Sequence, residues 1–402
     1  MPVPVDDILE ALEIDCAEPS FHYLEALFAR FNQRVPFESA SKIVRNAEVA
    51  DPREKPRWPD VFWADHLESG AGGTCFARVA AFQALIASLG FDVRPVLGRV
   101  QEDFDHAALL VRSGSEPDEW ICDVGFPLPA LLAAREGGTD TALAEVHVAP
   151  TPRGWSVEML EGVPEGPRKL EIFAAPAAEE EFRSRWRATF ERRTKFLTSV
   201  SLRAERPGRI LSFGAGEIRV DDRHSRTRIP LPSPRAPILE EQFGTDAALL
   251  DRAFSLVGDA EPPAQNAEIT VYLETSSDPA AAFAAIGSRP AYVEFLSGAA
   301  HASAQDQPGG DWRVRLSPEE GAESGVLEEE VRADAQALRL EIRRGSQTSF
   351  FEVGTRNSRT YLLRRRPLEG PRLDLLRNDS LRGRLAGTLA VDLVAWARRL
   401  AR

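Results

Sequence analysis

The stretch Gly72-Gly73-Thr74-Cys75-Phe76 carries the clearest signal for chemistry in this sequence. From Phe76 onward apolar residues recur at helical spacing as far as Leu89, and the two glycines indicate an irregular turn just before them. Cys75 is therefore predicted in the first turn of a helix, where unpaired N–H groups and the helix dipole favour an anionic, nucleophilic sulfur. The alternative is a cysteine that only packs, because free cysteines are among the most buried residues.

A histidine and an aspartate downstream could complete a nucleophilic site. We expect a β-hairpin in which His106 begins one strand and Asp123 ends the next, with the turn centred between Gly114 and Ser115. That register places His106 directly opposite Asp123, within reach of a bond between ring and carboxylate. His106 would then take the thiol proton, and Asp123 would orient the ring. Taken singly, either residue could be purely structural.

The elements that must position these residues change in type along the chain. The expected helices lie at 18–31, 61–67, 76–89, 178–192, 238–256 and 381–402, with a loop at 46–60. Strand patterns are frequent between 91 and 160 and again beyond 269. A polar, proline-bearing stretch at 259–266 marks a domain boundary. These patterns predict an α+β protein with more than one domain.

Length, charge and cysteine content bound the class of protein. The 402 residues, 43% of them hydrophobic, suffice for two or three domains with a sizeable core. A formal net charge of −13 argues against nucleic acid as a partner. Three cysteines are too few for a disulfide framework, and Cys122 is expected only to pack. The N-terminus lacks a signal-peptide pattern and no apolar run spans a bilayer, so we expect a cytoplasmic protein without membrane insertion.

Four segments resemble, in order and context, the arylamine N-acetyltransferase family. They are Val35-Pro36-Phe37-Glu38, Gly72-Gly73-Thr74-Cys75-Phe76, His106 and Asp123-Val124-Gly125-Phe126. The similarity covers about residues 1–256. It implies ping-pong acyl transfer, in which acetyl-CoA or another acyl-CoA acylates Cys75 and an amine, hydrazine or related acceptor then receives the acyl group. It also implies His106 as the base, Asp123 as the orienting acid and no permanently bound cofactor.

The resemblance implies a papain-like arrangement of subdomains. These are a helical bundle with the nucleophile at 1–90, a β-barrel with His106 and Asp123 at 91–176, and an α/β lid at 177–262. Residues 263–402 resemble, in the order of their elements, the helix-grip fold of the START and polyketide-cyclase-like superfamily. Such a module would hold a hydrophobic substrate, and its alternative is a structural appendage.

Further residues are assigned to the substrates by the same resemblance. The acyl-CoA site is expected to include Gly125, Phe126 and Pro127, and the substrate pocket Phe37, Phe76 and Phe104. The partner is expected to be a small-molecule amine or a hydrophobic compound.

The chain departs from the family pattern around the nucleophile. Family residues that are mostly polar or charged are replaced at Ser39, Ala71, Ala77, Val79 and Pro127. Because Ala71 stands where the family has an arginine, Glu38 is either solvated or paired with a basic residue from elsewhere in the chain. Pro127 replaces a glycine and removes a backbone donor near the acyl-donor loop.

Three functions fit these observations. The first is a cysteine acyltransferase, and the second is an amide synthase or hydrolase that uses the same three residues on a polyketide-type thioester. The third is a catalytically decayed protein that binds a small molecule or lipid, which the replaced polar residues would explain. The histidines are scattered without metal-ligand spacing, so no metal site is expected.

Overall fold

The computed structural model describes residues 3–112, 119–126, 128–161, 168–191, 194–296, 301–307, 311–317, 327–356 and 359–400. The chain divides into two compact units. Within the described residues, the first holds those up to 161, 168–220 and 231–263, and the second holds 221–230 and 264–400. Residues 221–230 thus group with the second unit, whereas the sequence pattern places them in 177–262.

Helix α5 (Cys75–Ser88) lies in the core of the first unit, and side chains on most of its faces are buried. Helix α4 (Pro59–Ser69) packs against it. Pro59 occupies the first turn of α4, and Gly70 ends that helix with φ 63°, a left-handed conformation that suits glycine. Cys75 is the first residue of α5, as predicted.

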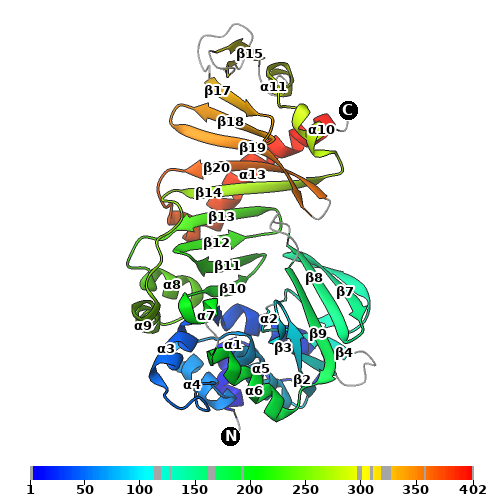
Figure 1. The fold of residues 1–402 in the computed structure, drawn as a ribbon, viewed down its shortest axis with the longest axis vertical. Helices are drawn as coiled ribbons and strands as arrows, with labels where there is room; N and C mark the ends of the chain where they lie inside the picture. The colour runs from blue at the N-terminus through cyan, green and yellow to red at the C-terminus, as the bar shows by residue number, and fades with distance from the viewer. Residues whose placement is uncertain are drawn as a thin grey trace. The chain divides into compact units, whose positions relative to one another are not determined.

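The other helices of this unit surround these two. They are α1 (Val5–Leu12), α2 (Phe21–Arg34), α3 (Ala40–Glu48), α6 (Glu179–Glu191), α7 (Lys195–Thr198), α8 (Ala236–Phe243) and α9 (Ala247–Val257). Helix α2 starts at Ser20, whose side chain accepts a hydrogen bond from the Tyr23 N–H. In Figure 1 the helices α1 to α5 and α6 gather at the end of the unit that holds the N-terminus.

An eight-stranded antiparallel sheet of the described residues packs beside α5 through β2 and β3. Its strands are β2 (Asp92–Arg99), β3 (Asp103–Arg112), β4 (Glu119–Cys122), β5 (Leu132–Ala133), β6 (Gly137–Asp140), β7 (Ala144–Thr151), β8 (Gly154–Glu161) and β9 (Arg168–Pro176). They pair in the order β5-β4-β3-β2-β9-β8-β7-β6. The sheet spans almost the same residues as the expected barrel at 91–176.

A second sheet of this unit ties the Pro-Phe-Glu segment to the glycines before the cysteine. Its strands are β1 (Phe37–Glu38), β10 (Leu202–Arg206), β11 (Arg209–Gly214) and β12 (Glu217–Asp221), paired in that order. Phe37 also forms a parallel bridge with Gly73. A Cβ atom on Gly72 would lie 1.8 Å from the Pro36 carbonyl oxygen, so only glycine allows this approach.

The second unit is an antiparallel sheet with a long helix against it. Its strands pair in the order β13-β14-β20-β19-β18-β17-β16-β15. They are β13 (Ser225–Pro230), β14 (Ala267–Thr275), β15 (His301–Asp306), β16 (Trp312–Ser317), β17 (Leu327–Asp334), β18 (Arg339–Arg344), β19 (Gln347–Arg356) and β20 (Arg359–Leu368). The helices are α10 (Pro279–Ala284), α11 (Arg289–Leu296), α12 (Asp374–Arg377) and α13 (Asp379–Leu400). Helix α13 packs against β14 and β20 (Figure 1).

The mixture of helices and antiparallel sheets confirms the α+β class, and two local expectations need correction. The single helix expected at 238–256 is two helices, α8 and α9, because Gly244 ends the first with φ 77°. The chain before the expected loop at 46–60 forms α3, which the sequence pattern did not reveal.

Candidate active site

Cys75 begins α5 with its side chain partly exposed. Thr74 precedes it in an extended conformation, and the first backbone bond of the helix runs from the Arg78 N–H to the Thr74 carbonyl. The Cys75 Sγ atom lies 4.0 Å from the backbone oxygen of Asp105, which precedes His106 in β3. The thiol therefore meets the eight-stranded sheet directly.

His106 and Asp123 form a buried pair next to that thiol. The His106 Nε2 and Asp123 Oδ2 atoms are 2.7 Å apart, and the two residues are 2% and 0% exposed. Burial lowers the pKa of His106, but the Asp123 carboxylate and the Cys75 sulfur raise it more, and the pKa rises to about 10. The ring is therefore protonated at neutral pH and can face a thiolate.

The strand register brings these two residues together differently from the prediction. Leu109 pairs with Cys122, so the ladder runs toward Ala108 opposite Asp123 and not toward His106. His106 is the fourth residue of β3 and Asp123 follows the last residue of β4, which corrects both expected strand ends. The side chains meet along the diagonal between neighbouring strands, a distance that long side chains can bridge.

The backbone after Asp123 closes around the thiol. The Gly125 and Phe126 N–H groups donate to Asp123 Oδ1 at 2.9 and 2.8 Å. A Cβ atom on Gly125 would lie 2.9 Å from the Cys75 Cβ, so Gly125 makes room for the nucleophile. The Phe126 ring lies 6.1 Å from the His106 ring. Pro127 lies outside the described residues.

Arg57, which lies outside the motifs, takes the place of the family arginine that is Ala71 in this chain. Glu38 is fully buried, and the Arg57 Nη2 atom lies 3.9 Å from its Oε1 atom. Arg57 also donates to the Gly72 carbonyl and, at 3.0 Å, to Asp65. Of the two alternatives for Glu38, the structure has the paired one.

Arg78 links two of the motif segments from within the core. It is 1% exposed and donates to the carbonyls of Val35 and Val124, the latter at 2.7 Å, and to Asn32 Oδ1 at 2.9 Å. Burial lowers its pKa to about 9, against the opposing effect of Asp123 and other carboxylates. A single arginine in an otherwise apolar helical run was the sequence signal that could have revealed it.

The three phenylalanines assigned to the substrate pocket contact different partners. The Phe76 ring is 1% exposed and packs against Phe182 at 5.3 Å, so it belongs to the core and is not accessible to a substrate. Phe37 is partly exposed and packs against Phe196 at 5.3 Å. Phe104 is partly exposed, with φ 66°.

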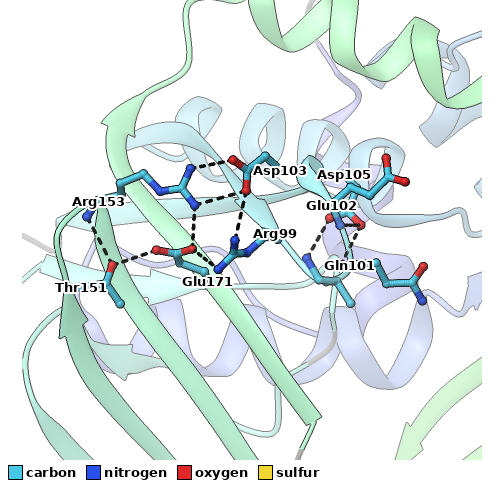
Figure 2. Close-up of polar contacts among 9 residues, drawn as sticks. Arg99, Gln101, Glu102, Asp103, Asp105, Thr151, Arg153 and Glu171 are labelled. Carbon is cyan, nitrogen blue, oxygen red and sulfur yellow. Dashed lines mark hydrogen bonds and ion pairs between the residues drawn. The ribbon is translucent and has the colours of Figure 1, made fainter.

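A network of ion pairs holds the start of β3, the strand that carries Phe104 and Asp105 (Figure 2). Arg153 donates to both carboxylate oxygens of Asp103, at 2.8 and 3.2 Å, and to Glu171 at 3.0 Å. Arg99 lies 2.9 Å from the same Glu171. The Asp105 carboxylate, in β3, accepts hydrogen bonds from the three consecutive N–H groups of residues 100–102 in the turn before it, at 2.8 to 3.0 Å. The start of β3, which meets Cys75, is thus fixed by residues of β2 and β9 and by Arg153, which lies between β7 and β8.

Among the residues that the structure describes, no group of three or more His, Cys, Asp or Glu residues could hold a metal ion. No described helix combines the length and apolarity needed to cross a membrane.

Comparison with protein families places this geometry in context. Residues 20–147 match the model of the N-acetyltransferase family. Among curated proteins, the arylamine N-acetyltransferase of Escherichia coli K12 is 33% identical over 117 residues, which are 27% of this chain and 38% of that protein. Proansamycin X synthase of Amycolatopsis mediterranei is 31% identical over 106 residues, 24% of this chain and 38% of that protein. The chain thus matches well under half the length of these relatives.

Solved structures resemble this chain in fold over more residues than the sequence matches cover. The arylamine N-acetyltransferase of Mycobacterium marinum, in complex with CoA, superposes with a TM-score of 0.55 at 18% identity. The superposition covers 63% of this chain and 98% of that structure. At this identity the likeness concerns the fold alone.

Proposed function

Because the N-terminal part of this chain belongs to the arylamine N-acetyltransferase family, we propose that the protein is a cysteine acyltransferase with Cys75, His106 and Asp123 as its catalytic residues. The observation that carries the proposal is the buried His106–Asp123 pair at 2.7 Å beside a cysteine that begins a helix. A histidine held by a carboxylate and adjacent to a thiol is the arrangement that nucleophilic cysteine catalysis requires.

In the first half-reaction the Cys75 thiolate attacks the carbonyl carbon of an acyl thioester. The C–S bond to the donor thiol breaks, and His106, which holds a proton at neutral pH, gives that proton to the departing thiolate. Asp123 keeps the ring oriented through its Oδ2 atom, while its Oδ1 atom is fixed by the N–H groups of Gly125 and Phe126. The acyl group is then a thioester on Cys75.

In the second half-reaction an amine attacks the Cys75 thioester. His106, now neutral, accepts the proton that the amine nitrogen loses, and the Cys75 sulfur leaves as a thiolate. The negative charge on the carbonyl oxygen in both steps falls at the start of α5, where the N–H groups of the first turn have no helical partner. We assign the N–H of Cys75 or Phe76 as one donor to that oxygen.

An acyl-CoA is the first donor to consider, because a relative in fold was solved with CoA. The expected CoA contacts are Gly125, Phe126 and Pro127. Of these, Gly125 and Phe126 donate their N–H groups to Asp123, and Gly125 packs against Cys75, which fits a role near the donor carbonyl.

A second candidate is an amide synthase that takes its acyl group from a polyketide-type thioester. The observation that favours it is the match to Proansamycin X synthase, a relative named for synthesis and not for acetyl transfer. Both candidates share the acyl-enzyme step, so the donor alone separates them.

We also propose the subdivision 1–90, 91–176, 177–262 and 263–402, with residues 221–230 joined to the last part and a helix-grip module as that part. Support for the module comes from α13, which packs on β14 and β20, and from the bond of 2.9 Å between Trp396 Nε1 and the Ala282 carbonyl. Its interior is aromatic, with the Phe351 ring 5.5 Å from the Trp396 ring.

The test is a panel of donors offered to the full-length protein with an arylamine or a hydrazine as acceptor. Turnover with acetyl-CoA supports the acetyltransferase, and turnover with a polyketide-type thioester alone supports the synthase. His106→Asn should abolish either activity, whereas His147→Asn, at an exposed histidine, should leave it unchanged. Absence of turnover with every donor and acceptor would leave the binding protein as the better explanation.

A further inference from the structure

A buried arginine binds the chain just before the proposed nucleophile and has no role in the mechanism above. Arg57 lies in the loop between α3 and α4 and is 5% exposed. A guanidinium is seldom buried unless carboxylates or carbonyls accept its hydrogen bonds. Its Nη2 atom donates to the Gly72 carbonyl, and its Nη1 atom donates to Asp65 Oδ2 at 3.0 Å. The Arg57 Cζ atom lies 4.9 Å from the centre of the Phe62 ring, so the guanidinium is fixed at its face as well as at its edge.

The peptide group between Gly72 and Gly73 is bound at both of its polar atoms. Its oxygen accepts a hydrogen bond from Arg57, and its N–H donates to the Pro36 carbonyl at 3.3 Å. Two consecutive glycines allow many backbone conformations, so the bonds to this peptide group determine its orientation. A rotated peptide group would lose both bonds. Arg57 and the backbone of Pro36 therefore select one orientation together.

The carbonyls on either side of this peptide group also accept hydrogen bonds. The Ala71 carbonyl lies 3.2 Å from His66 Nδ1, and because a carbonyl only accepts, that nitrogen carries the proton. Burial lowers the pKa of His66 to about 4, so this donor is a neutral ring at pH 7. The Gly73 carbonyl accepts from the Glu38 N–H at 3.2 Å. Three consecutive carbonyls are thus bound from α4, from the loop of Arg57 and from β1.

The charged groups around Arg57 keep its donor in place. The Glu38 carboxylate, which is fully buried, lies 3.9 Å from Nη2 and also accepts from the Ser41 N–H at 2.8 Å and from the Ser41 hydroxyl. Asp65 binds the other end of the guanidinium from α4. The nearby Arg45 is engaged with backbone carbonyls of the same loop. Arg57 is therefore held between two carboxylates, with its Nη2 atom at the Gly72 carbonyl.

The orientation of this peptide group determines where α5 begins. Cys75 follows Gly73 by two residues, and the Thr74 carbonyl already accepts the first helical bond, from the Arg78 N–H at 3.1 Å. The N–H groups of the first turn have no helical partner, and they are the donors available to the oxyanion that forms when Cys75 attacks a carbonyl. A displacement of about 1 Å at such a group costs about a hundredfold in rate.

We propose that Arg57 is a positioning residue: it fixes the peptide group between Gly72 and Gly73 and thereby the N–H groups that stabilise the oxyanion at Cys75. The inference rests on the proposed function, because it concerns the same acylation step. Arg57 acts through the backbone and not on the sulfur. Its loss should therefore slow reactions of Cys75 that form an oxyanion and spare those that form none.

The experiment compares two reactions of the same thiol. Acylation by 4-nitrophenyl acetate passes through an oxyanion and releases 4-nitrophenolate, whereas alkylation by iodoacetamide displaces iodide from a saturated carbon. Both are followed by mass spectrometry of the residue 75 peptide in a Cys16→Ser background, because Cys16 is exposed. Arg57→Met should slow acylation by a factor of about ten to a hundred and leave the alkylation rate unchanged. Arg53→Met, at an exposed arginine of the same loop, is the matched control and should retain both rates.

Arg57→Met leaves the Glu38 carboxylate buried without its cation, so the double variant Glu38→Gln/Arg57→Met, which removes both charges, carries the test if the single variant does not fold. It should show the same loss of acylation and the same alkylation rate. Acylation at the wild-type rate overturns the inference, as does equal slowing of both reactions or slower acylation in Arg53→Met. Failure of the proposed function looks different, because wild-type Cys75 would then form no acyl adduct, whereas failure of this inference leaves wild-type acylation intact.

Discussion

At the scale of single residues, the protonation of His106 links the candidate site to stability. Its pKa is raised from 6.5 to about 10 in the folded protein. The folded state therefore binds this proton more tightly, and the resulting stabilisation is complete below pH 6.5 and lost as pH rises toward 10. We expect the difference in melting temperature between wild type and His106→Asn to shrink over that range.

The measurement is a series of thermal melts of both proteins between pH 6 and pH 10. The variant lacks the group that titrates, so any pH dependence shared by both proteins cancels. A difference in melting temperature that is constant across the series would contradict the assigned proton on His106.

Lys42, a buried lysine on α3, should make a contribution to stability of the opposite sign while it is charged. Its pKa is lowered from 10.5 to about 8, so the folded state disfavours the proton and the lysine destabilises the protein while it is charged. Lys42→Met should therefore raise the melting temperature at pH 7, and this gain should shrink between pH 8 and 10.5 as the unfolded lysine also loses its proton. Melts of Lys42→Met beside wild type at these pH values test it. A lower melting temperature for the variant at pH 7 would contradict this expectation and show that the lysine side chain stabilises the fold.

Gly125 is a residue whose lack of a side chain has a specific purpose. A Cβ atom there would lie 2.9 Å from the Cys75 Cβ and 2.9 Å from the Ala107 carbonyl oxygen. Gly125→Ala should therefore displace the nucleophile and reduce acylation at least tenfold while the fold persists. Gly214→Ala is the matched control, because a Cβ atom there meets open space. Acylation is measured in samples quenched at successive times. Equal rates in the two variants would refute the proposed contact.

Sequence reasoning located Cys75, His106 and Asp123 because each stands in a local pattern. It could not locate the buried cations Arg57 and Lys42. Arg57 lies in a proline-rich loop, and its approach to Glu38 depends on tertiary structure. Lys42 lies in a helix whose short run of residues follows Pro-Phe-Glu without a clear apolar period, so its burial was not visible.

At the scale of elements, the turn between β2 and β3 determines where the sheet meets the nucleophile. Phe104 has φ 66°, which costs a residue with a side chain about 1–3 kcal/mol. The network of Asp103, Arg153 and Glu171 offsets this cost, although each exposed pair contributes little alone (Figure 2).

Arg153→Gln should loosen this turn without unfolding the protein. The N–H groups of residues 100–102 donate to Asp105, so their hydrogen exchange should become several-fold faster in the variant. Arg112→Gln is the control, since Arg112 sits at the other end of β3 with contacts no closer than 3.7 Å. Unchanged hydrogen exchange in Arg153→Gln would show that the turn is stable without the Arg153 ion pairs.

The types of the elements followed from the sequence, but their register did not. The hairpin of β3 and β4 was predicted from its strands, whereas the pairing of Leu109 with Cys122 could not be read from composition. A turn placed by composition alone leaves the register uncertain by a residue or two. His106 and Asp123 nevertheless meet, because diagonal neighbours also lie within reach of long side chains.

At the scale of the whole molecule, the boundary at 259–266 was visible as a change in composition. The two units meet in sequence at residue 263, inside that stretch. The assignment of 221–230 to the second unit was not visible, because β13 pairs with β14 across more than thirty residues of sequence. Such a pairing depends on contacts that no local pattern encodes.

The departures at Ala71, Ala77 and Val79 raised the possibility of a decayed enzyme, and the structure bears on it. Buried arginines are still present at the site, contributed by positions 57 and 78. Glu38 is paired and Asp123 holds His106. Buried ionic groups are costly to keep, so their presence around a cysteine favours a working nucleophile.

The most direct measurement is the intact mass of the full-length protein after exposure to a small panel of acyl thioesters, beside Cys75→Ala treated identically. A Cys75 nucleophile predicts that wild type gains the mass of one acyl group from at least one donor and that Cys75→Ala gains none. An adduct of equal yield on Cys75→Ala, or no adduct on wild type with any donor, would contradict the proposed acyl-enzyme.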